Sequence, residues 1–270
     1  MKTTEQASRY ADLDKMSVRQ LLEGMQAEDR TIPDVVAGVI PRLEELVEAV
    51  TVRVRGGGRV FYLGAGTSGR MGVVDASEIP PTYGVRDCFI GLIAGGDGAI
   101  RQAVEGAEDD AQQGWRDMLP HAPVAGDTLV GIAASGTTPY VLGAVRAARQ
   151  HGLLTACITC NAGTPLAAAV DIPVEAVVGP EFVTGSTRMK AGTCTKQLLT
   201  MFSTAVMIRL GHVRGSRMVD MQLTNDKLVD RGTRMVLAET GGDDYAAARS
   251  LLLRCGSVRA AVAEWRKTGW

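Results

Sequence analysis

Apolar residues follow a helical spacing in the first part of the chain. From residue 33 to about residue 55 they recur at positions i, i+3 and i+4, which predicts a helix with one buried stripe that ends at glycines 56–58. Before it, Ser17 and Gln20 have the form of a capping box, so a first helix should follow Ser17 and reach about Glu28. Residues 1–15 are polar, and we expect them to form a loosely held arm.

Beyond residue 59, short apolar runs alternate with segments long enough for crossover helices. The runs are 60–63, 89–94, 128–133, 154–160 and a weaker one, 172–178. This alternation predicts an α/β fold with a five-stranded parallel sheet, helices on both faces, and ligand sites at the carboxyl ends of the strands.

The last part of the chain reads as helical. A long apolar helix should open within residues 185–190 and reach about Leu210, and two short helices, 243–254 and 257–267, are separated by Gly256. We therefore predict a main domain, residues 1–239, which includes the N-terminal helices, and a small helical C-terminal domain, residues 240–270.

Two of the strands lead into loops that combine glycine with hydroxyl side chains. The first strand runs into a turn, residues 64–69, that carries the hydroxyls of Thr67 and Ser68. The third runs into Ser135, Gly136, Thr137 and Thr138, with Pro139 where a helix would begin. Such loops point backbone N–H groups and the positive end of a helix dipole at one spot, where a phosphate can bind. Two of them indicate one phosphorylated ligand held from two sides.

The first loop, with Gly64, Gly66 and Gly69, also matches the dinucleotide-binding fingerprint, but a lone match is weak. An Asp or Glu at the end of the next strand would normally complete it, whereas that strand ends in Ile-Ala-Gly-Gly, and Asp97 lies slightly too far along. A dinucleotide site would also leave the second hydroxyl loop unused. We favour a phosphorylated small molecule over NAD and over a merely structural turn.

Glu78 is the first candidate for proton transfer. On the helix that starts at the first loop, Val74 and Glu78 follow Met71 by three and seven residues, which places Glu78 on the apolar stripe. Pro80 and Pro81 should end the helix directly after it. A carboxyl group that faces a core or cleft loses hydration, so its protonated form is favoured and it can donate a proton. The alternative is an exposed glutamate in the last helical turn.

The acidic segment 103–110 offers a second carboxylate. On a helix whose apolar side includes Ile100, Ala103 and Ala107, Glu108 falls at the border of that side and Glu105 points further toward solvent. Glu108 is therefore the better candidate. A solvated acidic face remains an equal alternative on periodicity alone.

Composition excludes several classes of partner. The chain has 270 residues, 46% of them hydrophobic, and a formal net charge of −1, which gives no electrostatic reason to expect nucleic acid or an anionic membrane surface. No run of about 18 apolar residues occurs, and Met1 is followed by polar residues, so we expect neither a membrane span nor a secretory signal. The expected location is the cytoplasm.

No redox, metal or hydrolase site is predicted. Five cysteines, an odd number in apolar segments, are typical of reduced buried thiols, and Cys157 and Cys160 end a strand where no helix dipole would activate them. The three histidines, His121, His151 and His212, lack metal-ligand spacing. No Gly-x-Ser-x-Gly elbow accompanies a plausible triad.

Five longer segments resemble the N-acetylmuramic acid 6-phosphate etherases. They are LGAGTSGR (63–70), DASEIPPTYG (75–84), AVEGAED (103–109), GIAASGTTPY (131–140) and GSTRMKAGT (185–193), and the similarity runs in register from about Ser17 to the C-terminus. The resemblance implies the sugar isomerase (SIS) fold, a three-layer α/β/α sandwich whose members bind phosphorylated sugars. It also implies a homodimer that works in bacterial cell-wall recycling without a metal or organic cofactor.

The same resemblance implies a lyase reaction in which the C3 ether of N-acetylmuramate 6-phosphate is broken to give N-acetylglucosamine 6-phosphate and D-lactate. Carried over by motif, Glu78 is the acid for the lactate oxygen and Glu108 the base at C2, although these two roles can be exchanged. The phosphate would bind Ser135, Gly136, Thr137 and Thr138, with Thr67 and Ser68 completing the sugar site. Ser186, Arg188 and Lys190 are expected to help.

A rival function is a sugar-phosphate-binding regulator on the same fold, as in the glucokinase regulatory protein, a relative of the etherases. Both functions would keep the phosphate loops. Only the enzyme needs Glu78 and Glu108.

Overall fold

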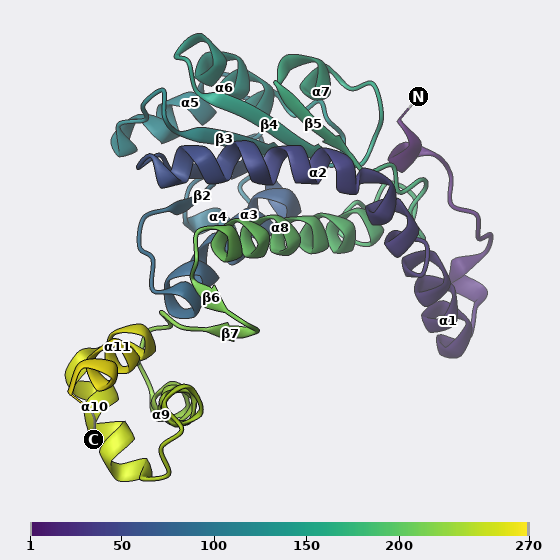
Figure 1. Ribbon diagram of the computed structural model, residues 1–270. Coiled ribbons are helices and arrows are strands. Elements are labelled where there is room, and N and C mark those ends of the chain that lie inside the picture. The colour runs from purple at the N-terminus through teal and green to yellow at the C-terminus, as the bar shows by residue number, and fades with distance from the viewer. Residues whose placement is uncertain (1, 269–270) are drawn as a thin grey trace. The chain divides into compact units, whose positions relative to one another are not determined.

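The computed structural model describes residues 2–268, and Figure 1 traces the chain through them. The chain divides into two compact units, the first comprising Met1–Ser77 and Cys88–Ser203 and the second Glu78–Asp87 and Thr204–Trp270. The predicted helical range 240–270 falls inside the second unit. Met1, Gly269 and Trp270 lie outside the described residues, so the outermost positions of the predicted ranges are not described.

A five-stranded parallel sheet forms the centre of the first unit. Its strands are β1 (Val60–Gly64), β2 (Phe89–Ile93), β3 (Thr128–Ile132), β4 (Leu154–Thr159) and β5 (Ile172–Glu175), in the spatial order β2-β1-β3-β4-β5. All pairings are parallel, and the five predicted strands are confirmed. Every residue of β1 and β3 is buried, as expected for strands covered on both faces.

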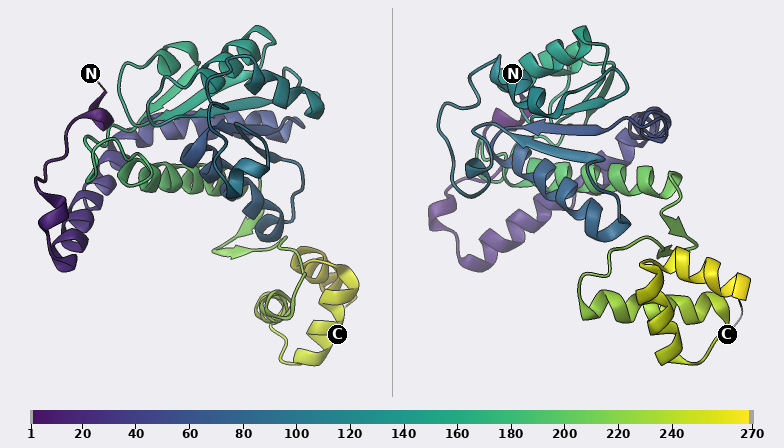
Figure 2. Two further views of the ribbon diagram at one scale, coloured as in Figure 1. Left: turned by 180° about the vertical axis from the view of Figure 1, so that it is seen from behind. Right: turned by 90° about the vertical axis from the view of Figure 1, so that its left-hand side faces the viewer.

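Helices cover both faces of this sheet, so the first unit is the predicted three-layer α/β/α sandwich (Figure 1). One face carries α5 (Gln113–Met118), α6 (Pro139–Gln150) and α7 (Pro165–Ala169), and the other carries α2 (Ile32–Arg55), α3 (Gly66–Tyr83) and α8 (Lys190–Arg209). The view from behind in Figure 2 shows the same separation of α2 and α8 from α6 and α7.

Alternation along β1 explains the two faces. Phe61 and Leu63 pack with buried apolar residues of α6 and α7, among them Val141. Tyr62 points to the opposite face, where its ring centroid lies 6.2 Å from that of Phe202 in α8. Successive residues of β1 therefore contribute to the hydrophobic cores on opposite faces of the sheet.

The N-terminal arm packs against the first unit, so the expectation of a loosely held arm is wrong. It contains two short 3-10 helices, Thr3–Glu5 and Leu13–Lys15. Thr4 is fully buried, and the ring centroids of Tyr10 and Phe182 lie 4.7 Å apart. The arm is held largely by polar contacts with distant loops, which a search for apolar periodicity does not detect.

The two N-terminal helices agree with the prediction. α1 (Val18–Asp29) begins after the capping box, in which the Gln20 N–H donates to Ser17 Oγ and the Ser17 N–H donates to the Gln20 side chain. α2 follows at Ile32 and continues through Pro41 to Arg55.

Two predicted features of the helices around the site are wrong. α3 continues through Pro80 and Pro81 to Tyr83, because the φ of proline suits a helix and the Gly84 N–H donates to the Pro80 carbonyl at 2.9 Å to close the last turn. Between α4 (Gly98–Arg101) and α5, residues 102–112 form bends and turns instead of a helix. Gly106 has a φ of 73°, a left-handed conformation that interrupts helical geometry.

The second unit is mainly helical and has its own core. It contains a β-hairpin, β6 (Val213–Arg214) and β7 (Arg217–Met218), and the helices α9 (Asp226–Thr240), α10 (Tyr245–Cys255) and α11 (Val258–Thr268). The two predicted C-terminal helices are confirmed, and Gly256 separates them with a φ of 77°. Buried Val236 and Leu252 belong to one apolar cluster of the three helices. Within residues 2–268, no helix combines the length and the apolar character needed to cross a membrane.

Candidate active site

The order of the strands places the candidate site at one edge of the sheet. In the order β2-β1-β3-β4-β5, β2 lies on one side of β1 and the later strands lie on the other, so the strand order reverses at β1. The strands β1 and β3 are neighbours, and their last residues, Gly64 and Ile132, pair with each other. The carboxyl ends of adjacent strands at such a switch point form a crevice, which is where open α/β sheets bind ligands. The two predicted hydroxyl loops follow these two strands and therefore lie side by side.

The first loop is a tight turn between β1 and α3. A Cβ added to Gly64 would lie 2.7 Å from the Gly69 nitrogen, and one added to Gly69 would lie 2.7 Å from the Gly64 carbonyl oxygen, so both positions require glycine. This close approach starts α3 at Gly66 and places the half-buried Thr67 and Ser68 in its first turn. The positive end of an 18-residue helix thus lies beside their hydroxyls.

The second loop has a similar construction. Gly136 has a φ of 65°, and a Cβ there would lie 2.4 Å from the side chain of Thr164, the residue that caps α7. Ser135, Thr137 and Thr138 are half-buried, and Pro139 begins α6 as predicted. Neighbouring strands therefore present two helix N-termini and five hydroxyls at the same edge, an arrangement suited to an anion.

A cavity of about 150 Å³ lies beside the first loop. Its lining includes Gly66 and Arg70 from α3 and the carboxylate-bearing residues Glu105 and Glu108. Arg70 is a residue that the sequence analysis did not single out. Its Nε donates to the Ile100 carbonyl at 3.0 Å and its Nη2 to the Ala99 carbonyl at 2.7 Å, which fixes the start of the segment that carries both glutamates.

Glu108 lies in a turn, and its side chain is exposed. Its backbone carbonyl accepts a hydrogen bond from the Tyr140 N–H at 3.0 Å, which ties this turn to the first turn of α6, directly after the second hydroxyl loop. The helical argument that distinguished it from Glu105 is wrong, since both residues line the cavity. Glu108 is thus tied by its backbone to the residue that follows the second hydroxyl loop, and it shares a cavity with Gly66 of the first loop.

Glu78 is exposed, so its predicted place on a buried stripe of α3 is wrong. The buried positions of the helix are 69, 72, 76, 79 and 83, and Val74 is 52% exposed. The stripe is displaced because Gly72 allows α3 to approach the sheet: a Cβ there would lie 3.0 Å from both Tyr62 and Ile132. Glu78 belongs to the second unit and Glu108 to the first.

The segment 185–190 is a loop that ends where α8 begins, at Lys190. Ser186 is half-buried and Arg188 exposed, so both are accessible to a ligand. Lys190 is 1% exposed, and its Nζ donates to the carboxylate of Glu28, which is also buried. Lys190 therefore has a structural role in this chain, as one half of a buried ion pair between α8 and α1.

The positive end of α8 is occupied by a carboxylate of the same chain. The backbone N–H groups of Lys190 and Ala191 donate to Glu181 at 2.8 and 2.9 Å. Burial raises the pKa of Glu181, although the hydrogen bonds from Ala191 and Lys190 oppose the rise. A ligand anion is thus expected at the starts of α3 and α6 instead.

The structure brings Asn161 and the N-terminal arm to the site, which the sequence analysis did not foresee. Asn161 follows β4 and is 2% exposed, and its amide donates to the Ala134 carbonyl at 2.8 Å and to Thr4 Oγ1 at 2.9 Å. Lys2 Nζ donates to Thr137 Oγ1 at 2.6 Å. No local pattern could reveal these contacts, since the partners are more than 130 residues apart in the sequence.

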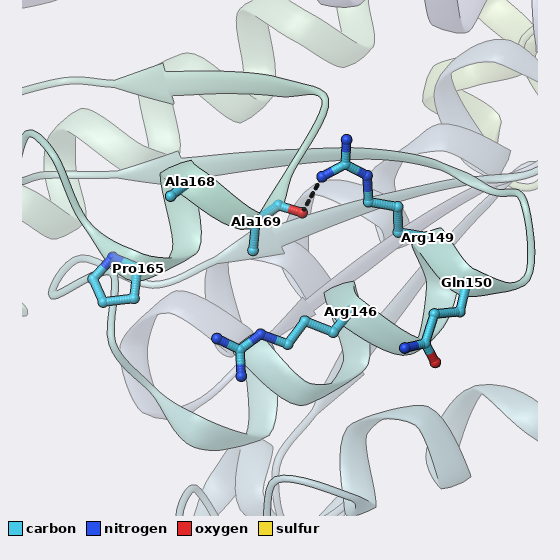
Figure 3. A pocket seen from close by; sticks show the side chains of 6 residues that line it. All are labelled: Arg146, Arg149, Gln150, Pro165, Ala168 and Ala169. Atoms are coloured by element: carbon cyan, nitrogen blue, oxygen red, sulfur yellow. Dashed lines mark hydrogen bonds between the residues drawn. The ribbon is translucent and has the colours of Figure 1, made fainter.

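A larger hollow of about 560 Å³ lies on the outer surface between α6 and α7 (Figure 3). It is lined by Arg146, Arg149 and Gln150 from the last turns of α6 and by Pro165, Ala168 and Ala169. Arg149 donates to the Ala169 carbonyl at 3.4 Å and pairs with Asp171 at 3.2 Å. The hollow has no carboxylate and no hydroxyl in its lining, so we do not place an acid–base reaction there.

Four of the five cysteines have the expected buried character, and Cys255 is partly exposed. Burial raises the pKa of the Cys157 and Cys160 thiols to about 12, so neither is a thiolate at neutral pH. Among residues 2–268, no group of three or more His, Cys, Asp or Glu side chains is placed to hold a metal ion.

Relatives of known name match nearly the whole chain. An N-acetylmuramic acid 6-phosphate etherase of Bacteroides thetaiotaomicron is 56% identical over 99% of this chain and 96% of its own length. Another, of Porphyromonas gingivalis, is 58% identical over 96% of this chain and 95% of its own length. A family model described as the glucokinase regulatory protein N-terminal SIS domain matches residues 42–149.

Solved structures share the fold over most of the chain. A phosphoheptose isomerase from Francisella tularensis superimposes with a TM-score of 0.54 at 16% identity, covering 72% of this chain and 100% of that one. One from Neisseria gonorrhoeae gives 0.53 at 18% identity, covering 70% of this chain and 98% of that one. These similarities are of fold, and they agree with the predicted SIS architecture.

Proposed function

This chain belongs to the N-acetylmuramic acid 6-phosphate etherase family, and from that premise we propose which of its residues carry out the reaction. The enzyme cleaves the C3 ether of N-acetylmuramate 6-phosphate to N-acetylglucosamine 6-phosphate and D-lactate, a step in cell-wall sugar recycling. The observation that supports the assignment of residues is that the two hydroxyl loops follow neighbouring strands and that a cavity lined by Glu108 lies beside the first loop.

The sugar reacts in its open-chain form, in which the C1 aldehyde makes the C2 proton acidic. The Glu108 carboxylate removes that proton, the C3–O bond breaks, and the electron pair forms a C2–C3 double bond conjugated with the aldehyde. A carboxyl group of Glu78 protonates the departing lactate oxygen. Water then adds at C3 and a proton returns to C2, which gives the product sugar without a change in oxidation state.

The phosphate binds between the two loops. Thr67 and Ser68 from the start of α3, and Ser135, Gly136, Thr137 and Thr138 before α6, supply hydroxyl and backbone N–H donors, and both helix dipoles favour the anion. Ser186 and Arg188 lie in an accessible loop and are proposed to contact the rest of the substrate.

Release of D-lactate from N-acetylmuramate 6-phosphate tests this function. Glu78→Gln and Glu108→Gln should each lower kcat by about 10²- to 10⁴-fold, the usual contribution of a general acid or base. Asp109→Asn is the matched control, because Asp109 is an exposed acid next to Glu108 that does not line the cavity. Undiminished turnover in both glutamate variants would overturn the mechanism.

Isotope exchange separates the two roles. In deuterium oxide, the Glu78→Gln variant keeps the base and should still exchange the C2 proton of the substrate without releasing lactate. The Glu108→Gln variant should neither exchange nor release. The opposite result would exchange the assignments of acid and base.

A regulator that binds sugar phosphates is the second candidate, favoured by the match of residues 42–149 to the glucokinase regulatory protein domain. It predicts ligand binding without any release of lactate by the unaltered chain. The near-complete alignment with named etherases argues for the enzyme.

We also propose that the enzyme is a homodimer in the cytoplasm, which the family resemblance supports. Light scattering should then give about 57 kDa, twice the 28.5 kDa of one chain. A mass near that of one chain would contradict the dimer. A charged sugar phosphate does not cross a bilayer unaided, so the enzyme is expected on the same side as its substrate.

A further inference from the structure

The second hydroxyl loop lacks a cation of its own. Residues 135–138 are Ser-Gly-Thr-Thr, whose hydroxyls and backbone N–H groups can bind a phosphate but cannot balance its charge. Hydrogen bonds to a phosphate are stronger when the donor is ionised, which is why lysine and arginine recur in phosphate sites.

The N-terminal arm brings a lysine to this loop. Lys2 Nζ donates to Thr137 Oγ1 at 2.6 Å, and Thr137 Oγ1 lies 3.3 Å from Ser135 Oγ. An ammonium group has three donors, so the contact with Thr137 leaves two for another acceptor. Lys2 is half-buried, and its charge is thus adjacent to two of the hydroxyls to which the phosphate is assigned.

The position of Lys2 is fixed by the residues that follow it. Thr3 Oγ1 donates to Asn161 Oδ1 at 3.0 Å, and the fully buried Thr4 accepts a hydrogen bond from the Asn161 amide. Asn161 also donates to the Ala134 carbonyl, in the turn directly before Ser135. The buried Asn161 side chain therefore fixes the position of the arm relative to the second hydroxyl loop.

The far end of the arm is anchored as well. Ser8 Oγ donates to the Phe182 carbonyl at 2.7 Å, and the Ser8 N–H donates to Thr184 Oγ1 at 2.9 Å. Residues 2–8 thus span from the second hydroxyl loop to the segment that precedes α8 (Figure 1, purple). A single hydrogen bond from Lys2 to a neutral hydroxyl contributes little free energy to offset the conformational entropy lost when the arm is ordered. The extensive anchoring of the arm therefore indicates that the charge of Lys2 has a function at this position.

We propose that residues 2–8 are a structural part of the sugar-phosphate site and that Lys2 is its phosphate-binding cation. The inference rests on the proposed function insofar as that function places a phosphate at residues 135–138. It adds a ligand from the opposite end of the sequence, supplied by a segment outside the α/β/α sandwich.

The test compares Lys2→Ala and Lys2→Arg with the control Lys15→Ala. Lys15 lies in the same arm, but it is exposed and pairs with Asp12 on the surface. Lys2→Ala should raise KM for N-acetylmuramate 6-phosphate by about 10- to 100-fold with kcat changed less than threefold, as expected for loss of a charged hydrogen bond. Lys2→Arg should recover part of this loss, and Lys15→Ala should behave as the unaltered chain.

Two further readouts separate a phosphate contact from a general loosening of the fold. The inhibition constant of inorganic phosphate should rise by a similar factor in Lys2→Ala, whereas the inhibition constant of N-acetylmuramic acid, which has no phosphate, should be unaffected. Thr4→Val, which removes the hydrogen bond from the Asn161 amide to Thr4 Oγ1 but keeps the one from the Thr4 N–H to Asn161 and keeps Lys2, should give a smaller rise in KM. Equal losses of affinity for the phosphorylated and the unphosphorylated sugar would overturn the role of Lys2 and leave only a structural arm.

Phosphate binding measured by calorimetry separates this inference from the proposed function. If the unaltered chain and Lys2→Ala bind inorganic phosphate equally, the inference is wrong whatever the activity. If the unaltered chain binds phosphate and Lys2→Ala does not, but no lactate is released by either, the inference stands and the proposed function fails.

Discussion

At the scale of single residues, Gly136 combines two constraints that can be separated by experiment. Its φ of 65° disfavours any side chain, and a Cβ would also collide with Thr164. Gly163 has a similar φ of 63° but open space around it, so it is a matched control.

Gly163→Ala should lower the free energy of unfolding by about 1–2 kcal/mol, the cost of a left-handed conformation. Gly136→Ala should lower it by a further 1–3 kcal/mol, roughly the cost of overpacking, and should raise KM for the phosphorylated substrate. Urea unfolding and steady-state kinetics measure the two effects. Equal destabilisation by both variants would show that the collision with Thr164 is relieved at no cost.

The prediction from sequence was least complete for the surroundings of individual site residues. Thr67 and Ser68 could be placed because strand propensity, glycine and hydroxyls occur together in a short segment. The prediction that Glu78 lies on a buried stripe was wrong because it assumed that Val74 faces the core. The close contact of Gly72 with the sheet directs a different face of α3 inward. Lys2 and Asn161 were missed because a polar contact across more than 130 residues leaves no local signal.

At the scale of elements, Asp127 joins the starts of two neighbouring strands. Its carboxylate is fully buried and accepts hydrogen bonds from the Arg59 backbone at 2.7 Å, the Arg59 guanidinium at 2.7 Å and the Val124 N–H at 3.0 Å. Burial opposes ionisation, but the bonds from Arg59 and Val124 outweigh it and lower the pKa of Asp127. The register of β1 and β3 at this end therefore depends on an ionised side chain.

Asp127→Asn should lower the free energy of unfolding at pH 7 by about 2 kcal/mol, since a buried bond to a charged partner is lost. A depressed pKa in the folded state contributes stability above the unfolded pKa of about 3.9, and this contribution is lost as pH falls through the folded value. The difference between the unaltered chain and the variant should thus be constant from pH 5 to 8 and shrink below about pH 4.

Urea denaturation over this pH range measures the difference. Glu23→Gln, which removes an exposed pair with Arg19, should change stability by less than about 0.5 kcal/mol and serves as the control. If the difference in the free energy of unfolding between Asp127→Asn and the unaltered chain persists undiminished at pH 3, the role of the ionised carboxylate is contradicted.

Elements were predicted well where a periodic pattern was long or a cap was explicit. The five strands and α1, α2, α10 and α11 agree with the sequence patterns. The segment 102–112 was wrongly predicted to be helical because the spacing of its alanines matches that of an apolar helical stripe. Gly106 adopts a left-handed conformation that periodicity cannot reveal. The prolines of α3 were misjudged because the φ of proline is compatible with a helical backbone, and the helix continues beyond them to Tyr83.

At the scale of the whole molecule, the two units each have a separate hydrophobic core. Leu129 is fully buried in the first and Leu252 in the second. Replacement of either by alanine should cost about 2–5 kcal/mol in its own unit. Calorimetry should therefore show two transitions, with Leu129→Ala lowering one melting temperature and Leu252→Ala the other.

Each leucine variant is the control for the other. A single transition lowered by both variants alike would mean that the chain unfolds as one cooperative body. The alternation of strands and helices predicted the architecture of the first unit because each element carries its own local pattern. The docking of residues 2–8 has no such pattern, since it depends on distant partners that only the folded chain brings together.

The contacts of the arm also have a consequence for the order of events during protein synthesis. Lys2 and Thr3 leave the ribosome early, but their partners Thr137 and Asn161 lie 135 and 158 residues further along. Lys2 and Thr3 must therefore wait for most of the sheet before they can dock, and closing so large a loop has an entropic cost. The nascent chain can thus bring residues 2–8 to the proposed phosphate site only after β3 and β4 have been made.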